Sequence, residues 1–182
     1  QDGCDNFCTF CIIPTVRGRA QSRPAPDIVQ ECLDLINSGH HELVLSGVNI
    51  GRYSWDGWGF SKLVEKILSL PGTFRVRVSS LEPDPIDEQF LELVDHEKFC
   101  PHLHICLQRG SDRVLLRMRR EYDVDRYLAL ISSIRSIWEK KGLLANFTTD
   151  VIVGFPTETE DDFEMTLRLL EAVSYTHLRA HE

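Results

Sequence analysis

Along most of the chain, short stretches with the pattern of a buried strand alternate with longer stretches that have the pattern of an amphipathic helix. The apolar periodicity predicts helices at 27–37, 60–70, 86–94, 112–118, 124–140 and from about Glu160 onward. Between them it predicts strands at 43–45, 74–78, 102–107 and 146–153. Strands separated by helices in this way indicate a parallel sheet with right-handed crossover connections. The chain is therefore predicted to have an α/β fold.

The number of predicted strands favours a partial (β/α) barrel, and a doubly wound open sheet is the alternative. We expect one more strand before Gly3, because the loop that begins there should follow a strand. At the other end, residues 174–182 do not continue the apolar periodicity of the last helix, and we expect them to be a non-native tail. The prediction is thus one incomplete domain, 1–173, truncated at both ends.

Composition narrows the functional classes. The chain has 182 residues, of which 42% are hydrophobic and 26% charged, as is usual for a soluble globular domain. It contains no apolar run near the ~20 residues that span a bilayer and no signal peptide, so no membrane association is expected. Six cysteines, three of them tightly spaced, fit a reducing compartment, and we expect the protein to lie in the cytoplasm.

The charge of the chain gives a mixed signal about nucleic acids. A net charge of −8 argues against a strong nucleic-acid-binding surface, which is normally basic. Positive charge is nevertheless clustered in two places, and each cluster fits either a binding surface or an ordinary solvated face. The clustered residues are Arg17, Arg19 and Arg23, and later Arg113, Arg117, Arg119 and Arg120.

Three cysteines near the start of the chain, Cys4, Cys8 and Cys11, have the spacing C-x3-C-x2-C. A structural zinc site needs four ligands and usually takes them as two C-x2-C pairs, whereas [4Fe–4S] clusters are normally held by four thiolates. Three thiolates leave one iron of a [4Fe–4S] cluster without a protein ligand, and that iron can bind a small chelating molecule. The spacing therefore favours a catalytic [4Fe–4S] site over three unrelated thiols in a loop.

Polar residues and glycines follow each predicted strand. In parallel βα folds the ligand site lies at the carboxyl ends of the strands, so these residues are expected to lie together near the cysteine loop. A turn or a helix cap would explain any one of them alone, but not their common topological position. They are Ser46, Gly47 and Asn49, then Ser79, Ser80 and Glu82, then Gln108, and finally Asp150 and Gly154.

Five ordered segments resemble the core of the radical S-adenosylmethionine (SAM) methylthiotransferases. They are GCDNFCTFCIIPTVRGRAQSRP, ELVLSGVNIGRY, RVRVSSLEPDPID, CPHLHICLQRGSDRVLLRMRREYDVDRY and TTDVIVGFPTETEDDF, and together they extend the resemblance over 1–173. Within this family, GVNIGRY and SSLEP are most similar to the branch that modifies threonylcarbamoyladenosine beside the tRNA anticodon. The resemblance implies a partial barrel of the radical-SAM type and a transferase that adds a methylthio group to C2 of that adenosine.

The resemblance also implies roles for individual residues. The three cysteines would hold the cluster, SAM would bind its open iron through the amino and carboxylate groups, and Phe10 would cover SAM on an apolar side. Gly47 would let the backbone approach the SAM amino group. Ribose and amino contacts would come from Glu82 and Gln108, and adenine contacts from the backbone at Gly154. The remaining expected SAM contacts are Ser46, Asn49 and Ser80.

Further parts of such an enzyme are not found in this chain. The resemblance implies a second [4Fe–4S] cluster held by three cysteines of an amino-terminal domain, and a carboxy-terminal RNA-binding domain. It also implies tRNA as partner and an electron donor such as a flavodoxin-type protein. The other cysteines, Cys32, Cys100 and Cys106, are expected to be buried inert thiols rather than ligands of a second cluster.

Some residues depart from the family pattern or stay open to two readings. Cys106 stands where the family usually has proline, Arg109 where it has serine, and Thr157 where it has glycine. Thr157 is expected either to place a β-carbon near SAM or to cap the next helix. His102 and His104 alternate on one strand, which suits a metal site or, as we prefer, a structural role or the lining of the SAM pocket. The two tryptophans at 55 and 58 are either a base-stacking surface or a packed loop.

Three alternative functions follow from the same features. The chain could belong to the isopentenyladenosine or the ribosomal-protein branch of the family. It could also be a radical-SAM enzyme that acts on a small molecule. A non-catalytic metal-binding or RNA-binding module is the third possibility, and it predicts a fourth protein ligand to zinc and no response to SAM.

Overall fold

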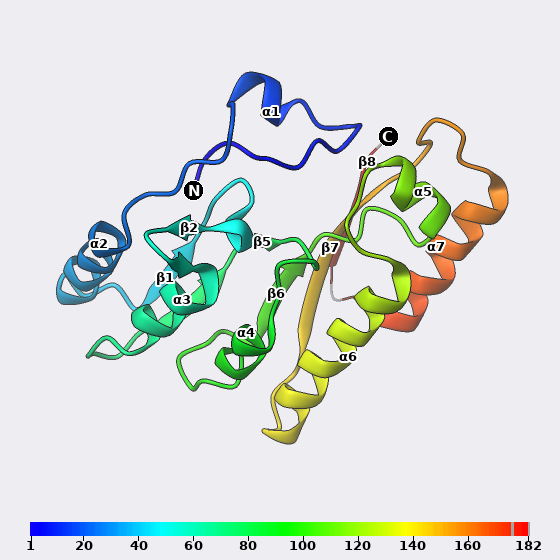
Figure 1. The fold of residues 1–182 in the computed structure, drawn as a ribbon. Coiled ribbons are helices and arrows are strands. Elements are labelled where there is room, and N and C mark those ends of the chain that lie inside the picture. The colour runs from blue at the N-terminus through cyan, green and yellow to red at the C-terminus, as the bar shows by residue number, and fades with distance from the viewer. Residues whose placement is uncertain (176, 182) are drawn as a thin grey trace.

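The computed structural model describes residues 1–175 and 177–181, with side chains described as far as residue 175. Parallel strands follow one another in chain order through the molecule (Figure 1). Strand β1 (Glu42–Leu45) pairs with β4 (Arg75–Val78), and β5 (Ser80–Leu81) pairs with β6 (His102–Ile105), which pairs with β7 (Asn146–Ile152). Only Ser79 separates β4 from β5, so the two sheets join into one curved surface.

Helices connect the successive strands, as the alternating pattern predicts. The helices are α1 (Ile13–Val16), α2 (Ala25–Asn37), α3 (Phe60–Leu68), α4 (Glu88–Leu93), α5 (Asp112–Arg117), α6 (Val124–Lys140) and α7 (Glu160–Val173). Among the described strands, paired neighbours follow one another in chain order without a reversal, so the sheet is a partial (β/α) barrel. The doubly wound alternative, which requires a reversal of strand order, is wrong.

The core lies between the helices and one face of the curved sheet. Alternate residues of β7 are buried, among them Phe147, and pack against α6, where the Trp138 and Phe147 rings lie 5.7 Å apart. The indole Nε1 of Trp138 donates a hydrogen bond of 2.9 Å to the carbonyl of Val94, so this buried ring has its polar atom satisfied. Helix α6 begins at a side-chain cap from Asp123, and α7 begins at a capping box formed by Thr159 and Asp162.

A short hairpin was not predicted from the sequence. After the 3-10 helix η1 (Ile50–Arg52), β2 (Ser54–Trp55) pairs antiparallel with β3 (Trp58–Gly59). The turn residues Asp56 and Gly57 have φ of 43° and 75°, the left-handed conformations that a two-residue hairpin needs. Both tryptophans are half-buried and pack against the core. This placement supports the packed-loop reading of the two tryptophans.

The segment that follows α7 also differs from the expectation. Residues His177–His181 form β8, which pairs parallel with β7 from the Thr148–His177 position onward. This strand was not predicted from the sequence, because residues 177–181 lack the periodicity of the preceding helix and backbone pairing does not require that periodicity. The non-native origin of residues 174–182 stays a prediction. Among the described residues, no helix combines the length and apolar character needed to cross a bilayer.

Candidate active site at the carboxyl ends of the strands

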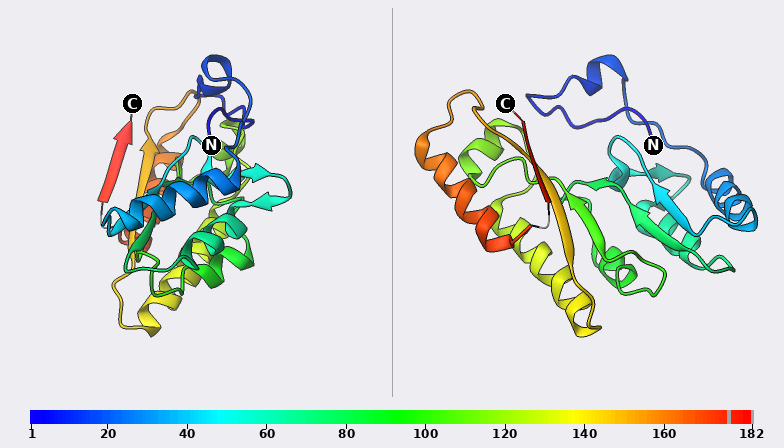
Figure 2. Two further views of the ribbon diagram at one scale, coloured as in Figure 1. Left: turned by 90° about the vertical axis from the view of Figure 1, so that its left-hand side faces the viewer. Right: turned by 180° about the vertical axis from the view of Figure 1, so that it is seen from behind.

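The cysteine loop crosses the end of the molecule at which the strands finish (Figures 1 and 2). The two ends of this loop, residues 2–5 and 17–21, are held together by an antiparallel bridge between Asp2 and Gln21. The Cys4 amide also donates a hydrogen bond of 3.1 Å to the Gly18 carbonyl. Gly3 has a φ of +65°, and a β-carbon on it would lie 2.1 Å from the Arg19 carbonyl oxygen. Only glycine fits this position, so the loop closure depends on Gly3.

Each arginine of the first cluster forms an ion pair with a nearby carboxylate. Arg17 pairs with Asp2 at 3.0 Å, Arg19 pairs with Asp5 at 2.9 Å, and Arg23 pairs with Glu31 at 2.8 Å. The first two pairs join the two ends of the cysteine loop. These arginines therefore hold the chain locally, and their charge is offset rather than presented as a basic surface.

The three thiols differ in exposure, with Cys4 and Cys8 buried and Cys11 half-buried. The Asn6 amide lies 3.3 Å from the Cys4 sulfur, and the Arg120 Nη1 lies 3.2 Å from the Cys8 sulfur. Burial raises the pKa of the Cys8 thiol, and the guanidinium of Arg120 opposes that rise. Both contacts place hydrogen-bond donors where a thiolate would carry negative charge.

This donor set fits a [4Fe–4S] cluster in its chemistry. Three soft sulfur ligands on one loop are the ligand type that such clusters require. Within the described part of the chain, no three histidine, cysteine or acidic side chains are gathered closely enough to hold a single ion. A cluster takes each cysteine on a different iron, so its ligands spread around it, whereas zinc ligands converge on one ion. The four-ligand zinc module stays the alternative, to be tested by metal analysis.

Arg120 connects the cysteine loop to the strand ends. Its side chain is only 3% exposed, and it forms an ion pair with Glu82, one of the predicted site residues. It also stacks 5.0 Å from the ring centre of Tyr122, whose hydroxyl donates to the Cys106 and Leu107 carbonyls. The sequence showed Arg120 only as one member of a basic run. No local pattern distinguishes it from Arg119 beside it, which is exposed.

Helix α5 supports the cysteine loop from the other side. The Thr9 amide donates 3.2 Å to the Met118 carbonyl, and the Thr9 hydroxyl donates 3.1 Å to the Arg117 carbonyl. These carbonyls belong to the last turn of α5, where the helix leaves them without internal partners. The side chain of Arg117 reaches the hydroxyl of Thr157 in the loop after β7. One short helix thus joins the cysteine loop to the loop after β7.

The residues after β1 lie beside the cysteine loop, as predicted. Asn49 is 5% exposed, and its Nδ2 lies 3.8 Å from the Cys4 sulfur, while its Oδ1 has no partner among the described residues. A buried oxygen of this kind is the polar group that a bound molecule would satisfy. At Gly47 a β-carbon would lie 3.0 Å from the Gln1 carbonyl oxygen, so a close approach within the chain also favours glycine there. The contact of Gly47 with SAM stays a prediction.

The next strand end presents two serines in different settings. The Ser79 hydroxyl is buried and has no partner among the described residues, which makes it a better candidate for a ligand contact than we predicted. Ser80 is exposed and lies opposite His104 in the β5–β6 register.

Gln108, after β6, is buried and has a φ of +63°. The backbone amide of Gln108 donates to the backbone carbonyl of Asp150 at 3.0 Å, so the segment after β6 is joined to β7 near its carboxyl end.

The paired histidines face the same side of the sheet, as predicted. His104 Nδ1 lies 3.0 Å and His102 Nε2 lies 3.4 Å from the hydroxyl of Thr148, and His104 Nε2 lies 3.7 Å from the Asp150 carboxylate. Burial lowers the pKa of His102, and the nearby Arg77 adds to this effect. The pair thus belongs to a hydrogen-bonded polar row inside the curved sheet.

The loop after β7 contains Gly154, which has a φ of +74°. The carboxylate of Glu158 accepts the amides of Gly154 and Phe155 at 2.8 and 3.0 Å. These two donors are therefore turned toward Glu158. Thr157 also has a left-handed φ, of 74°, and it does not cap α7, because the cap is Thr159. At the other side of the site, the ring of Phe10 is 38% exposed.

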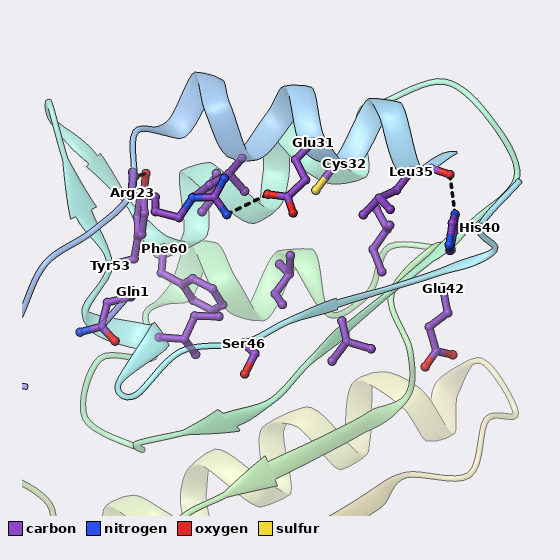
Figure 3. A pocket seen from close by; sticks show the side chains of 16 residues that line it. Gln1, Arg23, Glu31, Cys32, Leu35, His40, Glu42, Ser46, Tyr53 and Phe60 are labelled. Atoms are coloured by element: carbon purple, nitrogen blue, oxygen red, sulfur yellow. Dashed lines mark hydrogen bonds and ion pairs between the residues drawn. The ribbon is translucent and has the colours of Figure 1, made fainter. Parts of the chain in front are cut away.

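A separate groove of about 300 Å³ runs between α2 and the edge of β1 (Figure 3). Apolar side chains such as Leu35 and Phe60 line it, together with Cys32 and the Arg23–Glu31 pair. Among the described strands none pairs with this edge of β1, and Val44 is 56% exposed there. Gln1 lies at the end of the groove, next to the carboxyl end of β1.

Comparison with known proteins gives a consistent family match. The model of the Radical SAM superfamily matches residues 1–170. The chain is 40% identical over 176 residues to the threonylcarbamoyladenosine tRNA methylthiotransferase MtaB of Chlamydia pneumoniae, covering 96% of this chain and 41% of that protein. It is 41% identical over 182 residues to the tRNA-2-methylthio-N(6)-dimethylallyladenosine synthase of Lawsonia intracellularis, covering 95% of this chain and 39% of that protein. The chain thus spans about two fifths of the length of these relatives.

Solved structures agree on the fold. The cobalamin-dependent SAM radical enzyme OxsB matches with a TM-score of 0.73 and 13% identity, over 93% of this chain and 25% of that one. The coproporphyrinogen III oxidase HemN of Escherichia coli, a radical SAM enzyme, matches with a TM-score of 0.66 and 18% identity, over 100% of this chain and 43% of that one. The prediction of a partial barrel of the radical-SAM type is confirmed.

Proposed function

Because this chain belongs to the radical SAM superfamily, we propose that it is the catalytic core of a tRNA methylthiotransferase. The observation that supports this proposal most directly is the cysteine loop held at the carboxyl ends of the strands. Relatives at about 40% identity that are named tRNA methylthiotransferases support the reaction class. Residues of the loop and of four strand ends would together form the site.

Cys4, Cys8 and Cys11 would hold a [4Fe–4S] cluster and leave one iron for SAM. When bound, the cluster and SAM supply a 5′-deoxyadenosyl radical that removes hydrogen from the substrate. The Glu82–Arg120 pair offers both charges that the amino and carboxylate groups of SAM need. Asn49 Oδ1 and Ser79 Oγ offer unpaired buried oxygens beside them. Phe10, Ser46, Gly47, Ser80, Gln108 and Gly154 complete the proposed SAM contacts.

The proposed substrate is threonylcarbamoyladenosine 3′ to the anticodon, with C2 of its adenine as the acceptor of the methylthio group. The segments GVNIGRY and SSLEP support this branch, and a relative named for it is 40% identical. The dimethylallyladenosine branch is the second candidate, because a relative of that name is 41% identical.

The remaining parts of the enzyme are proposed from the family resemblance. An amino-terminal domain would hold the second [4Fe–4S] cluster, and a carboxy-terminal domain would bind tRNA. A strand before Gln1 would fill the groove along β1, which has the free edge and apolar lining that a parallel strand needs. A flavodoxin-type protein would donate electrons, and the reaction would take place in the cytoplasm, where its tRNA substrate is.

The reaction can be tested in cells that lack both tRNA methylthiotransferases. The full-length protein that contains this core would be expressed there, and tRNA nucleosides would be measured by mass spectrometry. We expect 2-methylthio-threonylcarbamoyladenosine with the native protein and none with Cys8→Ala. Product on dimethylallyladenosine would assign the second branch. No methylthiolated nucleoside from a folded, cluster-loaded protein would contradict the proposed reaction.

A further inference from the structure

A buried ion pair connects the segment after β6 with the loop after β7. Arg109 is 0% exposed, and its guanidinium pairs with the carboxylate of Glu158, whose side chain is also buried. Burying both charges is costly, and removing one member of such a pair leaves the other charge buried without a partner. In the sequence, Arg109 is distinguished only as a departure from the serine usual in similar proteins. Nothing in the proposed chemistry uses this pair directly.

The pair connects two strand ends. Arg109 follows Gln108 at the end of β6, and its Nη1 donates 2.7 Å to the carbonyl of Ile152 at the end of β7. The same guanidinium holds Glu158, which lies four residues beyond Gly154. Arg109 therefore contacts both the strand that leads into the loop 153–158 and the acidic residue that closes it.

The shape of this loop depends on Glu158. One carboxylate oxygen, Oε2, accepts the amides of both Gly154 and Phe155, and the other, Oε1, faces Arg109. Accepting two amides fixes the orientation of two consecutive peptide groups. Without Arg109 the carboxylate would be buried without a counter-charge and would have to move toward water. Its two hydrogen bonds to the loop would then be lost.

We propose that Arg109 is a positioning residue for SAM, which acts through Glu158 by holding the 153–158 loop in the form that accepts the adenosyl group. This inference rests on the proposed function. It predicts that Arg109 affects binding of the adenosyl part of SAM and leaves the methionine part unaffected. No contact of Arg109 with SAM is required.

The test uses the 182-residue chain with its cluster reconstituted under anaerobic conditions. Binding of SAM and of methionine would be measured by calorimetry for the wild type and for Arg109→Ser. We expect the Kd for SAM to rise about tenfold, as for the loss of a charge-assisted hydrogen bond that shapes a site, while the Kd for methionine changes less than twofold. Ile134→Ala, a buried substitution in α6, is the matched control for general destabilisation.

A second readout follows the loop without any ligand. Hydrogen exchange of the Gly154 and Phe155 amides should be slow in the wild type and in Ile134→Ala, and at least tenfold faster in Arg109→Ser. Should Arg109→Ser fail to fold, Arg109→Lys keeps the charge but cannot reach Ile152 and Glu158 with the same fork. It should show the same changes at smaller amplitude.

The outcomes distinguish a failure of the proposed function from a failure of the positioning role of Arg109. A wild-type chain that loads a cluster but binds neither SAM nor methionine would contradict the proposed function, and amide exchange would then decide the loop restraint alone. SAM binding within twofold of the wild type, together with unchanged exchange at residues 154 and 155, would overturn the positioning role. Equal weakening of SAM and methionine would overturn it too, because the effect would not be specific to the adenosyl group.

Discussion

Removing the guanidinium of Arg120 tests the link between the cysteine loop and the strand ends. In Arg120→Met, an apolar chain of similar length replaces a side chain that is almost fully buried against Glu82 and Cys8. The carboxylate of Glu82 is then left in a mostly buried position without its partner. Losing one member of a buried ion pair typically costs about 3–5 kcal/mol. Glu82 is partly exposed, so we expect the lower end of this range, about 3 kcal/mol.

The size of the effect is measurable by thermal and urea unfolding. For a chain of this length, about 3 kcal/mol corresponds to a fall in Tm of roughly 6–12 °C. The double variant Glu82→Gln with Arg120→Met removes both charges and should recover most of that loss, because a neutral pair has no uncompensated charge. A Tm of Arg120→Met within 2 °C of the wild type would refute the reasoning. So would a double variant no more stable than the single one.

Two other predictions concern the cysteine loop and the capping box at the start of α7. Gly3→Ala should prevent closure of the cysteine loop, since its β-carbon would overlap the Arg19 carbonyl. We expect the iron bound per chain to fall at least tenfold, while the far-ultraviolet circular dichroism spectrum stays that of the wild type. Normal iron loading of the variant would contradict this prediction. Asp162→Asn should destabilise the protein by about 2 kcal/mol at pH 7, because the Asp162 carboxylate completes the capping box of α7 with Thr159 and pairs with Arg113. Hydrogen bonds from Arg113, Ser111 and Thr159 hold the pKa of Asp162 well below its usual range, so its contribution is complete above the unfolded pKa near ~3.9 and lost as the pH falls further. Urea unfolding should therefore show a smaller difference in the free energy of unfolding between wild type and variant at pH 3 than at pH 7. An equal difference at both pH values would contradict a stabilising role of the ionised Asp162 carboxylate.

Much of the fold could be predicted from periodicity because its helices bury one face and its strands are separated by clear breaks. Helix α6 shows this well, since the predicted range 124–140 is the observed one. The hairpin at 54–59 was missed because its strands have two residues each, too short for any period to be visible. Strand β8 was missed because backbone pairing alone defines it.

The candidate site was predictable to the level of strand ends but not of individual contacts. The positions of Glu82, Asn49 and Gln108 after strands were predicted because polar residues after strands share one edge of a parallel sheet, and their contacts with SAM stay a prediction. Arg120 and Arg109 were not, because each acts across more than twenty residues of sequence, on Cys8 and Glu82 or on Glu158. A charged side chain on a surface helix and one buried in a strand-end network look the same in sequence. Only the fold distinguishes them.

The central claim is that the cysteine loop forms an open-iron cluster site for SAM. The most direct test is anaerobic reconstitution with iron and sulfide, followed by electron paramagnetic resonance of the reduced protein with and without SAM. We expect a [4Fe–4S] signal that SAM changes and that is absent in Cys8→Ala. A folded protein that forms no cluster, or whose cluster signal is the same with and without SAM, would contradict the account.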